Sequence, residues 1–226
     1  MEQEIRTFRL RDGALAPEWL SEFEALARPS YIDASELVAE EVRRCNVAYL
    51  LIDDTGELGA FFLVGWREGD LPAPGVHDVY LGLSAARQGA KGRGRAGSLY
   101  RAFQRDAAAW EAAHGQRLLV WFTTASPVVV AAGWHLFADP EPRPDGSFSA
   151  TRAQMLGAIM ETEGLTARAC SLHPFVLRGV ARARYSIEET ERLSALGATA
   201  ASDMLAQLRI NEKAGDRLVC TACIPL

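Results

Sequence analysis

The residues from Val76 to Gly115 constrain the fold of this chain more than any other stretch. VHDVYLGL (76–83) has the apolar and β-branched composition of a strand, and a loop dense in glycine and basic residues follows it. The chain then becomes helical, with apolar residues on about one side and Gly115 in the C-cap position. A strand that passes through a glycine-rich loop into a helix is an arrangement that commonly holds phosphate groups.

The loop has the chemistry of an anion site. Glycines at 89, 92, 94 and 97 let the backbone turn tightly and approach a ligand closely. Backbone N–H groups point outward at the start of a helix, where the helix dipole adds positive potential. Three basic side chains add charge: Lys91, Arg93 and Arg95. The sequence therefore predicts a phosphate or pyrophosphate site, with an ordinary solvated turn as the alternative.

Two familiar phosphate loops do not fit this context. The P-loop pattern needs Gly-Lys followed by Ser or Thr, and neither tripeptide occurs in the chain. The dinucleotide fingerprint GxGxxG can be matched at Gly92, Gly94 and Gly97, but it belongs after the first strand of a βαβ unit. Here it follows the fourth expected strand, after an antiparallel hairpin.

The order of the other elements favours a mixed sheet covered by helices on both faces. Two apolar runs flank a hairpin turn at 53–56. Ser126 and Pro127 begin a short helix as its cap and its first helical residue. Strands are expected at 4–10, 47–52, 59–66, 76–83, 116–122, 174–185 and 217–224. Further helices are expected at 17–27, from Asp33 or Ser35 to Cys45, at 126–133, 150–163 and 187–209.

Composition is typical of a globular protein of one domain, 1–226. Hydrophobic residues make up 49% of the 226 residues and charged residues 23%. No window reaches the roughly 18 apolar residues of a membrane span, and the N-terminus lacks an apolar signal core. We therefore expect a cytoplasmic protein that does not enter a membrane. Residues 138–226 form an extended C-terminal part, whose proline-rich start makes 138–163 a lid-like segment.

Net charge and cysteine spacing narrow the partners. The net charge of −5 weighs against nucleic acid and favours a cationic ligand. Cys220 and Cys223 form a CxxC, but a zinc site normally needs a second pair, and none stands at usable spacing. We expect no metal and read the cysteines as structural.

The segment 79–100 resembles the acetyl-CoA-binding motif of the GCN5-related N-acetyltransferase superfamily. That motif is an apolar strand followed by Arg or Gln, two residues, Gly, any residue and Gly, leading into a helix. The strand here is VYLGL and the loop is RQGAKGRGRA. Gly92 and Gly94 match directly, whereas Gln88 matches only if one extra residue near Ala90 is allowed. The resemblance in element order extends over residues 4–137.

The resemblance implies an α/β (α+β) fold with a mixed, mostly antiparallel central sheet that is splayed in the middle. The splay lies between strands 76–83 and 116–122, and helices cover both faces. It also implies an acyl-CoA-dependent N-acyltransferase that moves an acetyl or other acyl group from coenzyme A to an amine. The implied cofactor-binding residues lie on the strand and the loop: Leu81, Gly82, Leu83, Gln88, Gly89, Lys91, Gly92, Arg93, Gly94 and Arg95.

The proton-transfer groups are less well marked. Members of the superfamily often carry a tyrosine four residues before a Gly-Phe pair, which protonates the departing thiolate. Here the pair is Gly133-Trp134 and position 129 is valine, so Ser126, His135 or water would have to substitute. His77 is the first candidate base and Asp78 the second. Glu68 and Asp70 are candidates to line the acceptor side.

The sequence is also compatible with two other functions. The same fold could bind acyl-CoA without turnover, as a regulatory domain. A nucleic-acid-binding module would rest only on the basic cluster of the loop. The expected acceptor is a small-molecule or peptide amine, and a homodimer is an open expectation.

Overall fold

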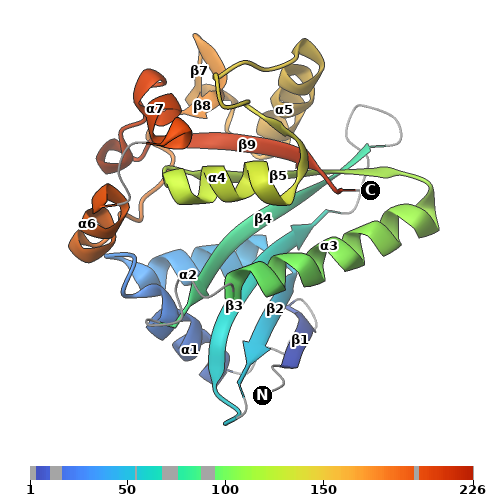
Figure 1. Cartoon of the computed structure of the whole chain (residues 1–226), viewed down its shortest axis with the longest axis vertical. Coiled ribbons are helices and arrows are strands. Elements are labelled where there is room, and N and C mark those ends of the chain that lie inside the picture. The colour runs from blue at the N-terminus through green and yellow to red at the C-terminus, as the bar shows by residue number, and fades with distance from the viewer. Residues whose placement is uncertain are drawn as a thin grey trace.

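The computed structural model describes residues 4–10, 17–53, 55–67, 76–87, 95–195 and 199–225, with helices packed on both sides of one sheet (Figure 1). The described strands form a nine-stranded sheet in the order β1-β2-β3-β4-β5-β9-β8-β7, and β6 pairs with β9. The β4–β5 pair is parallel, and the other pairs of this sheet are antiparallel. The expected mixed, mostly antiparallel sheet is therefore confirmed.

The N-terminal elements follow the expected order. They are β1 (Glu4–Arg9), α1 (Pro17–Ala27), α2 (Ala34–Arg44), β2 (Val47–Ile52), β3 (Leu58–Trp66) and β4 (Val76–Ala86). The turn between β2 and β3 is fixed by Asp53, whose carboxylate accepts hydrogen bonds from the backbone N–H groups of Thr55 and Glu57, each at 3.0 Å. Gly56 supplies the left-handed φ of +85° that closes the turn.

The sheet opens between its two parallel strands. After β4 come α3 (Arg95–His114), β5 (Arg117–Thr124) and α4 (Pro127–Leu136). Residues 76–80 of β4 pair with residues 117–121 of β5, and the pairing ends at Tyr80 and Trp121. Both strands continue beyond that point, to Ala86 and Thr124. The splay in the middle of the sheet lies where the resemblance implied it.

Successive side chains of β3 pack against opposite layers of helices. The ring of Phe61 stacks on Phe23 of α1, with centroids 4.3 Å apart, whereas Phe62 packs edge-on against Phe103 of α3. This alternation follows from the two-residue period of a strand. Helices α1 and α2 therefore cover one face and α3 the other. The face of α3 also carries α4, since Gln104 of α3 hydrogen-bonds the backbone carbonyl of Leu136.

The C-terminal part extends the sheet beyond β5. Its elements are β6 (Ala138–Glu141), α5 (Ala150–Thr162), the 3-10 turn Thr166–Arg168, β7 (Ala169–Cys170), β8 (His173–Leu177), α6 (Ile187–Ala195), α7 (Ala200–Gln207), the 3-10 turn Glu212–Ala214 and β9 (Arg217–Cys223). The central strand of this part is β9, which pairs with β5, β6 and β8. None of the described helices combines the length and the apolar character that crossing a membrane requires.

Two expectations for the C-terminal part were wrong in extent. The strand expected at 174–185 joins the sheet, but only as β8, which ends at Leu177. Gly179 has a φ of +62°, and the N–H groups of Val180 and Ala181 bond the carbonyl of Gly215 instead of a ladder. The helix expected at 187–209 is two helices, because Thr199 is extended and caps α7 through the N–H of Ser202.

Candidate functional site

A pocket of about 460 Å³ occupies the opening between β4 and β5. Residues 80–84 of β4 and 122–124 of β5 line it, with side chains from both helical layers. Helices α3 and α4 contribute from one face, and α2 and the C-terminal part from the other. The pocket therefore reaches both faces of the sheet through the splay.

The α3–α4 side of the pocket is apolar. Val128 and Val129 are 39% and 37% exposed, and Leu136 lines the same side. Helix α4 lies close to β5 here, because a Cβ on Gly133 would stand 2.7 Å from the ring of Phe122. An apolar ligand chain can therefore be held on this side.

A β-bulge shapes β4 where it lines the pocket. Leu81 pairs with Val64 and Ser84 with Phe62, so Gly82 and Leu83 together face one residue of β3. A bulge leaves a backbone amide outside the ladder. The amide of Leu83 instead donates to a carboxylate oxygen of Glu41 at 3.2 Å.

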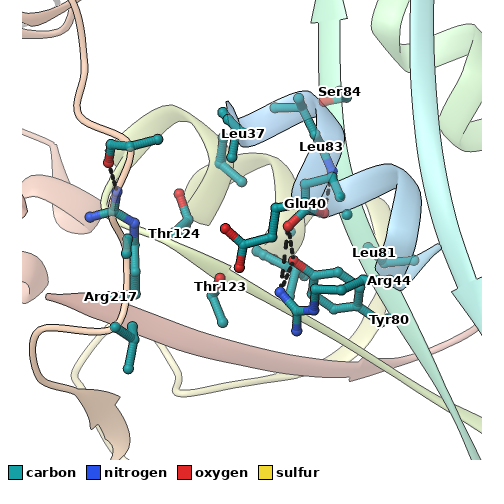
Figure 2. Close-up of a pocket in the computed structure, with 18 of the residues that line it drawn as sticks. Leu37, Glu40, Arg44, Tyr80, Leu81, Leu83, Ser84, Thr123, Thr124 and Arg217 are labelled. Atoms are coloured by element: carbon teal, nitrogen blue, oxygen red, sulfur yellow. Dashed lines mark hydrogen bonds and ion pairs between the residues drawn. The ribbon is translucent and has the colours of Figure 1, made fainter. Parts of the chain in front are cut away.

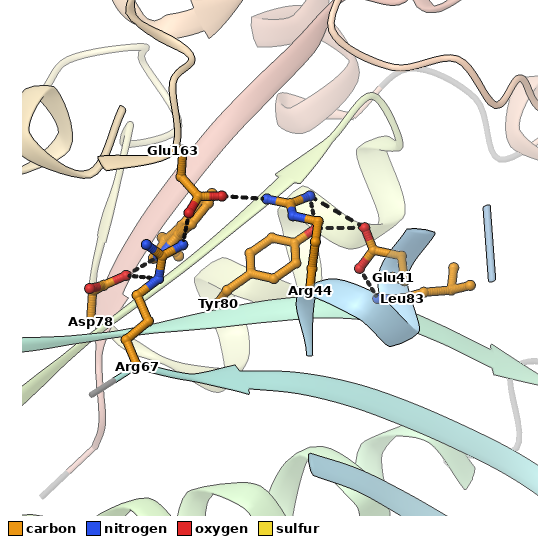
Figure 3. Close-up of polar contacts among 8 residues, drawn as sticks. Glu41, Arg44, Arg67, Asp78, Tyr80, Leu83 and Glu163 are labelled. Carbon is orange, nitrogen blue, oxygen red and sulfur yellow. Dashed lines mark hydrogen bonds and ion pairs between the residues drawn. The ribbon is translucent and has the colours of Figure 1, made fainter. Parts of the chain in front are cut away.

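Glu41 is the centre of a hydrogen-bonded cluster (Figure 3). Its Oε1 accepts from the Tyr80 hydroxyl at 3.0 Å and lies 3.4 Å from Nη1 of Arg44. The guanidinium of Arg44 is centred 4.1 Å from the centroid of the Tyr80 ring. Although it lies on a helix with many exposed charges, Glu41 itself is only 6% exposed.

The cluster continues across the sheet to a second carboxylate. Nη2 of Arg44 contacts Glu163 at 2.9 Å, and Glu163 also pairs with Arg67. Nε of Arg67 contacts Asp78 at 2.8 Å (Figure 3). Alternating charges thus connect α2, the residue that follows β3, and β4 to the residue that follows α5.

Burial changes the proton affinity of these carboxyls. It raises the pKa of Glu41, against the opposing effects of Arg44 and the hydrogen bond from Tyr80. It also raises the pKa of Asp78, against Arg67 and the N–H of Trp121. Glu41 lines the pocket, so it is a buried carboxyl that can exchange a proton with a ligand there.

The structure brings part of the expected cofactor site together. Leu81, Gly82 and Leu83 line the pocket. The expected loop residues Gln88, Gly89, Lys91, Gly92, Arg93 and Gly94 lie outside the described residues, as do Glu68 and Asp70. Arg95 begins α3, but its side chain is also outside the description.

The expected proton-transfer groups stand elsewhere. His77 packs edge-on against Trp110 of α3, with ring centroids 5.0 Å apart, and is not among the residues that line the pocket. The carboxylate of Asp78 accepts from Nε1 of Trp121 at 2.8 Å. Ser126 is 4% exposed and caps α4, and His135 is exposed on α4. None of these four contributes to the described pocket lining.

Glu41, Arg44 and Glu163 were missed in the sequence. The signal for Glu41 was present: Ala34, Val38 and Glu41 recur at the spacing of one helix face, and all three are buried. An acid on an apolar stripe marks a buried carboxylate. Arg44 and Glu163 are 119 residues apart in the chain, so their contact had no local signal.

The described residues hold no cluster of three or more His, Cys, Asp or Glu side chains that could bind a metal ion. All four cysteines are free thiols.

Comparison with known proteins found distant structural likenesses. No protein-family model matches the chain, and no curated protein matches it in sequence. A GNAT family N-acetyltransferase (YhbS) from Escherichia coli, solved in complex with CoA, is similar over 58% of this chain and 67% of its own, at 18% identity and a TM-score of 0.41. An aminoglycoside acetyltransferase from an uncultured soil metagenomic sample is similar over 60% and 91%, at 14% identity and a TM-score of 0.43.

A third likeness is to a Corynebacterium glutamicum protein described as histone acetyltransferase HPA2 and related acetyltransferase. It covers 62% of this chain and 87% of its own, at 11% identity and a TM-score of 0.44. Because these likenesses are distant, the fold is assigned from the structure itself: the strand order, the parallel β4–β5 pair and the opening beyond Tyr80. These agree with the fold that the resemblance to the GCN5-related superfamily implies.

Proposed function

We propose that this protein is an acyl-CoA-dependent N-acyltransferase, which moves an acetyl or other acyl group from coenzyme A to an amine. The observation that carries the proposal is the pocket in the opening between β4 and β5, which is apolar on one face and charged on the other. Two chemically different substrates can approach one point from opposite faces of the sheet. That geometry suits direct transfer, which needs two reactants held close together.

The α3–α4 side fits the acyl-CoA substrate. Beyond Tyr80, none of the described strands pairs with the edge of β4 that faces β5, so its backbone groups can pair with an amide-containing chain. Val128, Val129 and Leu136 offer an apolar wall beside that edge. The glycine-rich sequence at 89–97 leads into α3, and we propose that its amides hold the pyrophosphate.

The charged side suits the reacting amine. In direct transfer the amine nitrogen attacks the thioester carbon, the C–S bond breaks, and the nitrogen loses a proton while the thiolate gains one. We propose Glu41 as the proton acceptor in place of His77 and Asp78, because its buried carboxylate lines the pocket. The Leu83 amide could polarise the carbonyl once Glu41 has left it.

Two observations favour a second candidate, a domain that binds acyl-CoA without turnover. Glu41 already occupies the Leu83 amide, and Val129 stands where the superfamily often has a proton-donating tyrosine. Four tyrosines line the pocket from other positions and could supply that proton: Tyr31, Tyr80, Tyr100 and Tyr185.

An assay with two readouts separates the candidates. The full chain is incubated with acetyl-CoA and a panel of amines, and both thiol release and the mass of the acetylated amine are followed, while calorimetry measures coenzyme A binding. We expect binding together with an acetylated product. Binding without product from any amine would favour the regulatory domain, and absence of binding would refute both.

A further inference from the structure

Both walls of the charged side carry ionised groups. Helix α2 supplies Glu40, Glu41 and Arg44, and the C-terminal part supplies Glu163, Arg182 and Arg217. Arg44 pairs with Glu41 and Glu163, and Arg182 pairs with Glu36 at 3.4 Å. Glu40 on α2 and Arg217 on β9 are the opposite charges that stand outside these pairs, on opposite sides of the pocket (Figure 2).

Backbone bonds hold the two walls in register: the N–H of Ile32 bonds the carbonyl of Arg184 at 3.0 Å, and the N–H of Ser186 bonds that of Ser30 at 2.9 Å. These backbone hydrogen bonds therefore fix the position of the wall that carries Glu40 relative to the wall that carries Arg217.

Glu40 presents a carboxylate to the pocket. Figure 2 shows its side chain projecting into the middle of the pocket from α2. Glu41, beside it, is engaged by Tyr80, Arg44 and the Leu83 amide. Within the described residues no ion pair or side-chain hydrogen bond engages Glu40. Its carboxylate is thus available to a cationic group in the pocket.

Arg217 presents a buried guanidinium on the opposite side. Its side chain is 8% exposed, and it donates to the backbone carbonyls of Asp216 at 2.8 Å and Ala183 at 3.0 Å. Its nearest described carboxylate, on Glu212, is 3.7 Å away and also accepts from the N–H of Tyr185. The Arg217 guanidinium therefore donates its short hydrogen bonds to neutral carbonyl groups. A buried cation of this kind is stabilised further by an anionic partner at hydrogen-bond distance.

The side chains of Glu40 and Arg217 are too far apart to form an ion pair with each other. They lie on opposite sides of the same pocket (Figure 2), and no ion pair joins them in the described structure. Thr123 and Thr124 of β5 line the pocket between them. Opposite charges held apart across a pocket are complementary to a molecule that carries both charges.

We propose that the amine acceptor is a zwitterion of the amino-acid class, with its amine at Glu40 and Glu41 and its carboxylate at Arg217. A simple alkylammonium would leave Arg217 with only the carboxylate of Glu212, 3.7 Å away, as its anionic partner, and a dianion would face the carboxylates of Glu40 and Glu41. Acylation of the bound amine rests on the proposed function. Binding of the zwitterion does not rest on it, because the residues that bind the zwitterion are separate from the coenzyme A side of the pocket.

Matched ligands test the recognition directly. Each amino acid is compared with the amine that lacks only its carboxylate: leucine with 3-methylbutylamine, phenylalanine with 2-phenylethylamine, and lysine with 1,5-diaminopentane. Binding to the full chain is measured by calorimetry with and without coenzyme A, and kcat/KM with acetyl-CoA. For at least one pair we expect the amino acid to be favoured about tenfold or more, as for a lost charge-assisted hydrogen bond.

Substitutions on each wall test which residue binds the amine and which binds the carboxylate. Glu40→Gln, at an exposed position, should weaken an amino acid and its matched amine alike. Arg217→Met should remove the preference between them. Arg182→Ala, at a side chain that is 81% exposed and pairs with Glu36 at 3.4 Å, provides a less disruptive change on the same wall. Arg182→Ala should narrow the preference in a fully folded protein.

Three results would overturn the proposal: matched amines that bind as well as the amino acids, no binding of either ligand, or a preference that survives both arginine changes. Failure of the proposed function would look different. In that case coenzyme A binding or acyl transfer would be absent, while amino-acid binding to the free protein would still show its carboxylate dependence.

Discussion

The carboxylate of Glu41 sits on the backbone amide of Leu83 at 3.2 Å, and the glycine before that amide makes the approach possible. A Cβ on Gly82 would stand 2.5 Å from Oε2 of Glu41 and 2.7 Å from Sγ of Cys45. The bulge in β4 frees the amide, Gly82 leaves room, and α2 supplies the acid. An acyl oxygen that needs this amide must therefore displace Glu41 first.

We predict that Gly82→Ala destabilises the protein by about 1–3 kcal/mol, the usual cost of overpacking a dense site. Urea unfolding measures the change. Gly157→Ala in α5 is the matched control, because its added Cβ meets nothing within 4 Å. The control should gain up to about 1 kcal/mol, since alanine favours a helix over glycine. Equal stability of the two variants would contradict this view of the bulge.

The burial of Glu41 predicts a pH dependence of stability. Its pKa is raised above the ordinary 4.5, so the folded protein holds this proton more tightly than the unfolded chain does. The resulting contribution to the free energy of unfolding is fully present below 4.5 and is lost as pH rises through the raised pKa. Glu41→Gln cannot titrate and should lack this loss.

Urea midpoints of wild type and Glu41→Gln, compared from acidic to neutral pH, measure the effect. Relative to the variant, wild type should lose stability as the pH rises from about 4.5 toward neutrality. Asp78, whose pKa is also raised, is present in both proteins and cancels in the comparison. If the difference in stability between wild type and Glu41→Gln stays constant with pH, or shifts in favour of wild type as the pH rises, then the folded state does not raise the pKa of Glu41.

Kinetics of two variants separate the candidate bases. We expect Glu41→Gln to lower kcat about a hundredfold or more, a usual contribution of a general base, with coenzyme A affinity retained. The loss should be greatest at low pH and smaller at high pH, where free amine is abundant. His77→Ala should lose its contact with Trp110 and some stability, and keep the pH profile of wild type. The opposite pattern would assign the base to His77.

Much of the N-terminal half was predictable because its signals are local. The strand–loop–helix order, the hairpin at Asp53 and the Ser126–Pro127 helix start depend on neighbouring residues. The end of β8 was not predictable, because the apolar pattern of 174–185 continues while Gly215 draws the backbone away from the sheet. Likewise, Thr199 interrupts a continuous helical pattern by capping a new helix.

The candidate site was predictable only along β4. Leu81, Gly82 and Leu83 follow from the strand and its motif, whereas the cluster around Glu41 joins residues from four distant parts of the chain. His77 and Asp78 share the strand, but alternation sends His77 toward α3 and Asp78 toward Trp121. A strand position alone therefore does not show which residue reaches the pocket.

Ser126 offers a test of a structural role against a catalytic one. Its Oγ accepts from the N–H of Val129 at 3.5 Å, so Ser126→Ala should cost about 1 kcal/mol through loss of the helix cap. Ser126→Asn, another good capping residue, should restore most of this stability. We expect turnover to follow stability in the two variants. Equal and severe loss of turnover in both, with Ser126→Asn fully folded, would make the hydroxyl a proton donor.

Hydrogen exchange with and without coenzyme A tests whether the acyl-CoA substrate binds between β4 and β5. We predict slower exchange on binding at 81–86 of β4, at 122–124 of β5 and in α4, with the β1–β2 pair unchanged as the internal reference. Saturating coenzyme A that leaves exchange unaltered in these segments, or slows it only elsewhere, would contradict the placement of the acyl-CoA site between β4 and β5.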